Sequence, residues 1–215
     1  EMDGDGVVAG DGDIVTINQK IDMAGSADAS VPSVTFTYTV AANEMVEGAD
    51  ASVPAYAGIT EGVTVDTAVF GDGDVKDKDN TVTETFDVDF TGVTWTGVGV
   101  YRYTLTYTKD NAAVTVPEND TRYLDVYVGN DGQGGYEVLY YVLTSNATLT
   151  FNDETGTYNY ESKNNGFTAD YDTYSLTVKK YITGDMANLS DTFDFTVVFS
   201  NLPEGVQLKL DNADI

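Results

Sequence analysis

The chain has 215 residues, and 36 acidic against 10 basic side chains give it a formal net charge of −26. This charge disfavours nucleic acid and anionic membrane surfaces as partners, because both would be repelled. The chain has no Cys and no His. Disulfides, thiol nucleophiles and Ser–His–Asp or Cys–His catalysis are therefore excluded, while carboxylate chemistry, as in glycosidases, stays possible.

The N-terminal segment, from Glu1 to Asp13, is acidic and rich in glycine. It has neither a basic start nor an apolar run, so it is not interpreted as a signal peptide. No later segment approaches the roughly 18 consecutive apolar residues of a membrane span. These features predict no membrane insertion within this chain.

After this segment the dominant pattern is alternation, the period of a half-buried strand. Val34, Phe36 and Tyr38 share one side, for example, and Thr35 and Thr37 share the other. The abundance of Thr, Val and Tyr suits a pleated surface. Strands are predicted over Ile14–Ile21, Val34–Val40, Val63–Val69, Val82–Phe90, Tyr101–Tyr107, Tyr123–Val128, Tyr136–Thr144, Thr148–Asn152, Thr157–Glu161, Tyr174–Ile182 and Phe193–Phe199.

Clusters of Gly, Asp and Asn separate these runs, as turns do. They lie at Gly71–Asp74, Asp77–Asn80, Gly129–Gly135 and Lys163–Gly166. Many short strands with frequent turns, and no long amphipathic helix, predict a β-sandwich over residues 14–173. A boundary is predicted near Asp172–Thr173, because the two strands after it cannot bury both faces of a sandwich. Residues 174–215 are thus predicted to begin a second, incomplete β-sandwich domain.

Several motifs, in their order and spacing, carry a resemblance to a known family. They read VTINQKID, VTFTYTV, FTGVTWTGVGVYRYTLTYTK and, at the predicted boundary, GFTADYDTYSLTVKK followed by YITGDMANLSDTFDFTVVF. The chain resembles the Gram-positive major (backbone) pilins of the streptococcal T-antigen type over most of residues 14–200. The resemblance implies an all-β fold, an Ig-like or Cna-B-like β-sandwich followed by the first strands of a second similar domain.

The same resemblance implies a secreted, non-enzymatic structural subunit of a cell-surface pilus or adhesin stalk. The partners it implies are other pilin subunits or cell-wall peptidoglycan, joined by a sortase, with a host or glycan receptor as a further partner. The implied location is extracellular, in a pilus or anchored to the cell wall. Between a shaft pilin and a monomeric adhesin stalk, the order of motifs favours the pilin.

The family is known for isopeptide bonds that form without an enzyme. In its domains a Lys on the first strand attacks an Asn on the last strand, and a buried Glu moves the protons. Burial lowers the pKa of the Lys and raises that of the Glu, so a neutral amine meets a protonated acid. By register, these three positions hold Gln19, Tyr107 and Ala169 here, since a slip of one residue changes the face. We therefore predict no isopeptide bond in the first domain; an alternative interpretation pairs Lys20 with Asp170, one step out of register.

Two other lysines have counterparts in the family. Lys180 shares the predicted inward side of its strand with Leu176 and Val178, so it occupies the place of the isopeptide lysine of the second domain. Its partners would lie outside this chain, and the alternative is a lysine that extends to water from a strand end. Lys163, shortly before the last strand, lies near the place of the pilus-linkage lysine, or is an ordinary loop lysine. The LPEGV sequence at Leu202–Val206 is interpreted as a turn and not as a sortase signal.

Three further patterns have weaker interpretations. Two Gly-rich loops carry alternating acids: Asp72, Asp74, Asp77 and Asp79 in one, and Asp3, Asp5, Asp11 and Asp13 in the other. Such loops can bind Ca²⁺, but solvated turn acids are more common, so no cofactor or metal is expected. Trp95, Tyr136, Tyr140 and Tyr141 suggest a carbohydrate-binding surface module as the alternative function. A glycosidase is the third option and would need two carboxylates across a cleft.

Overall fold

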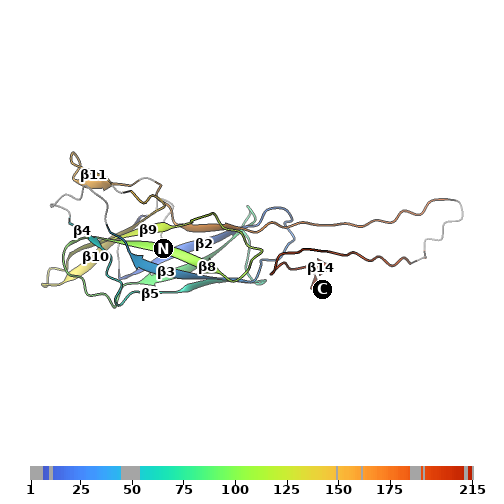
Figure 1. Ribbon diagram of the computed structural model, residues 1–215, viewed down its shortest axis with the longest axis horizontal. Helices are drawn as coiled ribbons and strands as arrows, with labels where there is room; N and C mark the ends of the chain where they lie inside the picture. Colours follow the sequence, from blue (N-terminus) through green and yellow to red (C-terminus); the bar gives the residue numbers. More distant parts are fainter. Residues whose placement is uncertain are drawn as a thin grey trace.

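The computed structural model describes residues 7–9, 12–44, 54–148, 150–160, 162–184, 190, 192–210 and 213–214. The described residues contain β-strands and no helix, and two facing sheets form an elongated sandwich (Figure 1). The all-β sandwich predicted from the alternation is confirmed. Within the same residues there is accordingly no helix long and apolar enough to span a bilayer.

The larger sheet has seven strands and is mostly antiparallel, in the order β1-β10-β9-β8-β3-β6, with β4 parallel to β8. Its strands are β1 (Val7–Ala9), β3 (Val34–Ala42), β4 (Ala55–Ala57), β6 (Thr67–Phe70), β8 (Gly99–Lys109), β9 (Arg122–Asn130) and β10 (Tyr136–Thr144). A bulge between Val138 and Tyr140 interrupts the pairing of β10 with β9.

The smaller sheet has four strands in the order β13-β2-β7-β5. Its strands are β2 (Ile14–Asp22), β5 (Thr64–Val65), β7 (Thr81–Asp89) and β13 (Gly166–Asp170). The last strand, β13, runs parallel to β2, and its register pairs Phe167 with Gln19 and Ala169 with Ile21. The strands of the smaller sheet that come first and last in the sequence, β2 and β13, are therefore direct neighbours.

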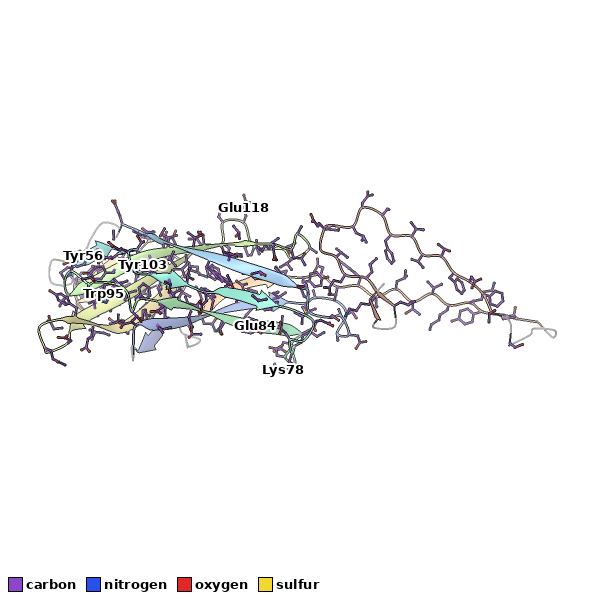
Figure 2. The ribbon with its side chains drawn as sticks, turned by 90° about the horizontal axis from the view of Figure 1, so that it is seen from below. Tyr56, Lys78, Glu84, Trp95, Tyr103 and Glu118 are labelled. Carbon is purple, nitrogen blue, oxygen red and sulfur yellow. The ribbon has the colours of Figure 1, made fainter. Side chains whose placement is uncertain are left out.

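The core lies between the two sheets and is built from alternate residues of each strand. On β2 the side chains of Val15, Ile17 and Ile21 are almost fully buried, as the period of two predicts. Aromatic rings fill much of the interior, and Tyr103 and Trp95 lie within the sandwich in Figure 2. Burying so many large rings supplies much of the hydrophobic free energy of folding.

A short hairpin covers part of the outer face of the larger sheet. It consists of β11 (Thr150–Asn152) and β12 (Thr157–Asn159). Tyr158 from this hairpin is buried in a small second cluster with Val100. The predicted strands here were longer, and the last residue of one of them, Glu161, lies outside the described residues.

The structure differs from the prediction after residue 173. Tyr174–Ile182 and Phe193–Phe199 were predicted as strands, but no residue of either segment is paired in a sheet. The chain runs away from one end of the sandwich and then back towards it, where β14 (Lys209–Leu210) pairs with β15 (Ala213–Asp214) (Figure 1). Alternation favours an extended backbone, but a stable sheet needs further strands to bury its apolar side.

Candidate functional site

The predicted site begins with Gln19, on the inward side of β2. Its side chain is fully buried. The Tyr38 hydroxyl donates a hydrogen bond to its Oε1 at 2.8 Å, and its Nε2 donates to the Lys20 carbonyl at 3.1 Å. Both ends of the amide are thus satisfied, which a buried amide requires. Because β2 and β3 belong to different sheets, this bond links the two layers of the sandwich through neutral groups.

Tyr107, on β8, occupies the second predicted position. Its hydroxyl donates to Asp120 Oδ2 at 3.0 Å, and its ring contacts Phe167 edge to face with centroids 5.0 Å apart. Burial raises the pKa of Tyr107 and of Tyr38 far above that of a free phenol. Both hydroxyls therefore stay protonated and act as hydrogen-bond donors, not as proton shuttles.

Ala169, the third predicted position, is fully buried on β13 and pairs with Ile21. Gln19 and Tyr107 meet in one cluster through Tyr38. The Tyr38 hydroxyl donates to Gln19, and its ring contacts the rings of Tyr107 and Phe167. Ala169 follows two residues after Phe167 and offers only a methyl group. The three positions therefore hold no amine and no last-strand carboxamide, and the absence of an isopeptide bond stays a prediction.

The alternative pair, Lys20 and Asp170, is offset along the strands. Lys20 lies opposite Thr168, and Asp170 lies opposite Asp22. Lys20 alternates with the buried residues of β2, so it lies on the outer side of the smaller sheet. Lys20 is thus outside the dry core between the two sheets, where the family reaction takes place.

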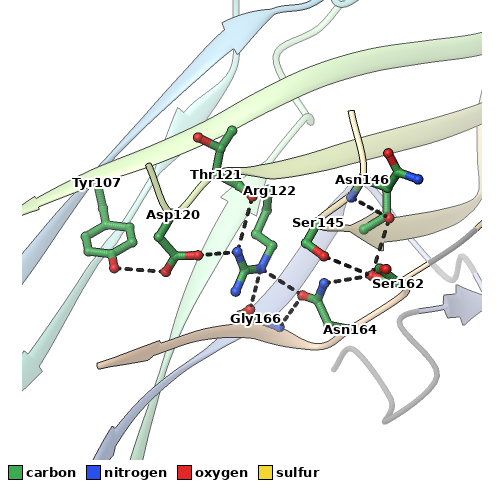
Figure 3. A network of polar contacts seen from close by, with 10 residues as sticks. Tyr107, Asp120, Thr121, Arg122, Ser145, Asn146, Ser162, Asn164 and Gly166 are labelled. Carbon is green, nitrogen blue, oxygen red and sulfur yellow. Dashed lines mark hydrogen bonds and ion pairs between the residues drawn. The ribbon is translucent and has the colours of Figure 1, made fainter. Parts of the chain in front are cut away.

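A polar network connects Tyr107 to the loop before β13 (Figure 3). Asp120 accepts from Tyr107 and also forms an ion pair with Arg122. Arg122 Nε donates to Asn164 Oδ1 at 3.0 Å and to the Gly166 carbonyl at 2.8 Å. The Arg122 guanidinium also lies over the Phe167 ring, 4.7 Å from its centroid. The network thus fixes the start of β13 against β9.

Lys163 lies in this fixed loop. Its neighbours on both sides are bonded: the Ser162 carbonyl accepts from the Ser145 amide at 3.1 Å, and the Asn164 amide donates to the Leu143 carbonyl at 3.1 Å. Lys163 itself forms an isolated bridge with Thr144. Its side chain is exposed, with the ammonium 5.9 Å from the centroid of the Tyr160 ring. The backbone of Lys163 is held while its amine is open to solvent.

Lys180 lies in the unpaired segment after the sandwich and is exposed. Its ammonium lies 5.3 Å from the centroid of the Phe193 ring. This contact joins the two predicted strands of the second domain in space. Its role as an isopeptide lysine stays a prediction.

Two acids of the Asp72–Asp79 loop, Asp74 and Asp77, accept hydrogen bonds from backbone amides in or next to the same loop. Asp74 accepts from the Gly71 amide at 2.7 Å, and Asp77 accepts from the amides of Asp79 and Thr81 at 2.9 Å each. These bonds lower the pKa of Asp77, as is usual for a turn carboxylate. In the described part of the chain, no three acidic groups come together as a metal site would require. In the other loop, Asp3, Asp5 and Asp11 lie outside the described residues.

Of the aromatic residues suggested as a sugar platform, Tyr140 is half-buried and stacks on Tyr127. Trp95 is only 8% exposed and packs against Phe90 and Tyr101, and Tyr141 is buried. Tyr136 is exposed, at 40%. Trp95, the residue on which a stacking platform would depend, therefore belongs to the core.

Sequence reasoning missed a buried charged pair on the outer side of the larger sheet. Arg102 and Asp125 face each other on β8 and β9, and neither side chain is exposed. Their closest approach is 3.7 Å, from Arg102 Nε to Asp125 Oδ1, and both of these atoms lack hydrogen-bond partners. Burial raises the pKa of Asp125 to about 6, although Arg102 opposes the shift. Each residue alternates with apolar ones on its strand, a pattern typical of water-facing side chains, and nothing in that pattern shows the hydrogen bond from Arg102 Nη2 to the Asn146 carbonyl.

Comparison with known proteins finds relatives only among solved structures, since no family model and no curated protein matches the chain. The major pilin protein T3.2 of Streptococcus pyogenes matches with a TM-score of 0.59 and 21% identity, over 77% of this chain and 53% of that one. Another major pilin of S. pyogenes matches with a TM-score of 0.55 and 21% identity, over 84% of this chain and 58% of that one.

A third S. pyogenes major pilin, T-13, matches with a TM-score of 0.50 and 24% identity, over 77% of this chain and 54% of that one. This chain thus spans little more than half the length of these pilins. At identities of 21–24% such likeness concerns the fold. The fold expected from the sequence motifs is confirmed: this chain has the β-sandwich fold of the streptococcal major pilins.

Proposed function

We propose that this chain is a structural subunit of a Gram-positive pilus or surface stalk, acting as a load-bearing module and not as an enzyme. The observation that carries the proposal is the fold match to three major pilins over 77–84% of the chain. The lack of His and Cys supports a non-enzymatic role, since the commonest catalytic bases and nucleophiles are missing. On this proposal the protein is displayed outside the cell, in a pilus or attached to peptidoglycan.

Polymerisation would use Lys163 as the amine that accepts the next subunit. A sortase holds the C-terminal carbonyl of that subunit as a thioester. Lys163 Nζ would attack this carbonyl, so that a C–N bond forms, the C–S bond breaks and the enzyme thiol takes up the proton. The exposed side chain supports this role, and so does the hydrogen-bonded turn, because a fixed backbone reduces the entropy lost when the enzyme binds.

The test is conjugation in vitro. The purified chain is incubated with a pilus-type sortase and a fluorescent peptide that carries the sorting signal of the enzyme. We expect a conjugate that survives boiling in detergent and maps to Lys163 by mass spectrometry. Lys163→Arg should abolish it, whereas Lys78→Arg should not, because Lys78 is also exposed but lies near the other end of β13 (Figure 2). Equal conjugation of both variants would contradict the assignment of Lys163.

A further inference from the structure

The chain leaves the sandwich at Thr173, which is firmly attached. The Thr173 amide donates to the Ala24 carbonyl at 2.8 Å, and the Ser26 amide donates to Thr173 Oγ1 at 2.7 Å. The Thr173 side chain is buried. A Cβ on Gly25 would lie 1.8 Å from the Thr173 carbonyl oxygen, so the two backbone segments touch here. This is the first attachment between the sandwich and the C-terminal segment.

The chain returns to the sandwich around Gly205, in the turn that the LPEGV sequence forms. The Gly205 carbonyl accepts from Asn111 Nδ2 at 3.3 Å, and the same amide nitrogen donates to the Ser33 carbonyl at 3.0 Å. Asn111 Oδ1 accepts from the Ala113 amide at 2.9 Å, and the Asn111 side chain is buried. Gly205 has φ +88°, and a Cβ there would lie 2.1 Å from Asn111 Oδ1. Only glycine fits this contact without a shift.

Lys209 adds a charged contact near the same end of the sandwich. Its ammonium donates to Ser30 Oγ and lies 3.1 Å from Asp72 Oδ1. Hydrogen bonds from Ser30 and Lys209 lower the pKa of Asp72, so this carboxylate is the ionised partner that the ammonium needs. The pair is partly solvated, so its contribution to stability is small, but its geometry is specific.

We infer that the loops carrying Ser30, Asp72 and Asn111 form a docking surface for residues 203–209. The surface fixes the orientation of the chain beyond Thr173 relative to the sandwich. A single attachment at Thr173 would let the following residues rotate about one point. A second attachment at Gly205 and Lys209, on different loops, removes that freedom. This inference is independent of Lys163 and of polymerisation.

The test measures a distance distribution by pulsed electron paramagnetic resonance. Because the chain has no Cys, the pair Thr83→Cys and Gln207→Cys can be spin-labelled without background. Both positions are exposed, one on β7 and one in the docked segment. We expect one narrow distance in the parent chain. Gly205→Val should lose the narrow component, because its side chain would collide with Asn111, and Lys209→Ala should broaden the distribution.

Each variant has a matched control. Gly184→Val changes a glycine of similar positive φ, +117°, in the same segment, where an added Cβ meets nothing within 4 Å. Lys78→Ala removes one exposed lysine whose ion pair is with its neighbour Asp79. Both controls should keep the narrow distance, and circular dichroism should show an intact sandwich in every variant. A broad distribution in the parent, or a narrow one in Gly205→Val, would overturn the inference.

Discussion

The hydrogen bond between Tyr38 and Gln19 should stabilise the sandwich measurably, and Tyr38→Phe tests this. The variant keeps the ring stacked on Phe86 but leaves Gln19 Oε1 without its donor in a site that water does not reach. A buried acceptor left unsatisfied costs about 1–3 kcal/mol. Replacing both groups, by Tyr38→Phe with Gln19→Leu, should recover part of this loss, because the buried Gln19 Oε1 that had lost its donor is then absent.

The assay is urea unfolding followed by tryptophan fluorescence, for which Trp95 is the only tryptophan and is buried in the same core. Tyr136→Phe serves as the control, since it removes a phenol hydroxyl from an exposed ring. The slope of free energy against urea should stay constant across the variants, so that midpoints report stability. An unchanged free energy of unfolding in Tyr38→Phe, or a double variant that loses the sum of both single losses, would refute the reasoning.

Three further predictions concern covalent chemistry, pH and metal. The intact mass of the chain should equal the sum of its residue masses plus one water for the two termini, and a loss of one further water, or of ammonia, mapping to Lys20 would contradict this. Because the pKa of Asp125 is raised in the folded state, ionisation opposes folding and stability falls as pH rises through about 4 to 6. Between pH 5 and 7.5 the parent should therefore lose about 1–2 kcal/mol relative to Asp125→Asn, and an equal difference at both pH values would refute the shift. Millimolar Ca²⁺ should leave the melting temperature unchanged, whereas a rise that Asp77→Ala removes would reveal a site.

The alternation of the sequence predicted which side chains enter the core. Val15, Ile17 and Gln19 are all buried on one side of β2, as expected from the period of two. The pattern predicted the face of each residue but not its partners. The bond from Gln19 to Tyr38 depends on how the two sheets are positioned against each other, and no local pattern carries that information.

The largest departures have the same origin. Arg102 and Asp125 have the alternation of water-facing residues, but both are buried, and Arg102 Nη2 donates to the carbonyl of Asn146, which lies just before the β11–β12 hairpin. Tyr174–Ile182 has the alternation of a strand, but no neighbouring strand pairs with it in the described residues. In both cases the local pattern indicates an extended backbone. It does not show which other segments bury a side chain or pair with a strand, because these depend on tertiary contacts.

The parallel pairing of β13 with β2 has a mechanical consequence. Tension applied before Ile14 and after Asp170 pulls these neighbouring strands in opposite directions along their length. The register pairs from Gly166–Asn18 to Asp170–Asp22 are then loaded in shear, all at once, and not opened one after another as in unzipping. The strand order by itself can thus let the sandwich resist extension, because all of these pairs must break at the same time.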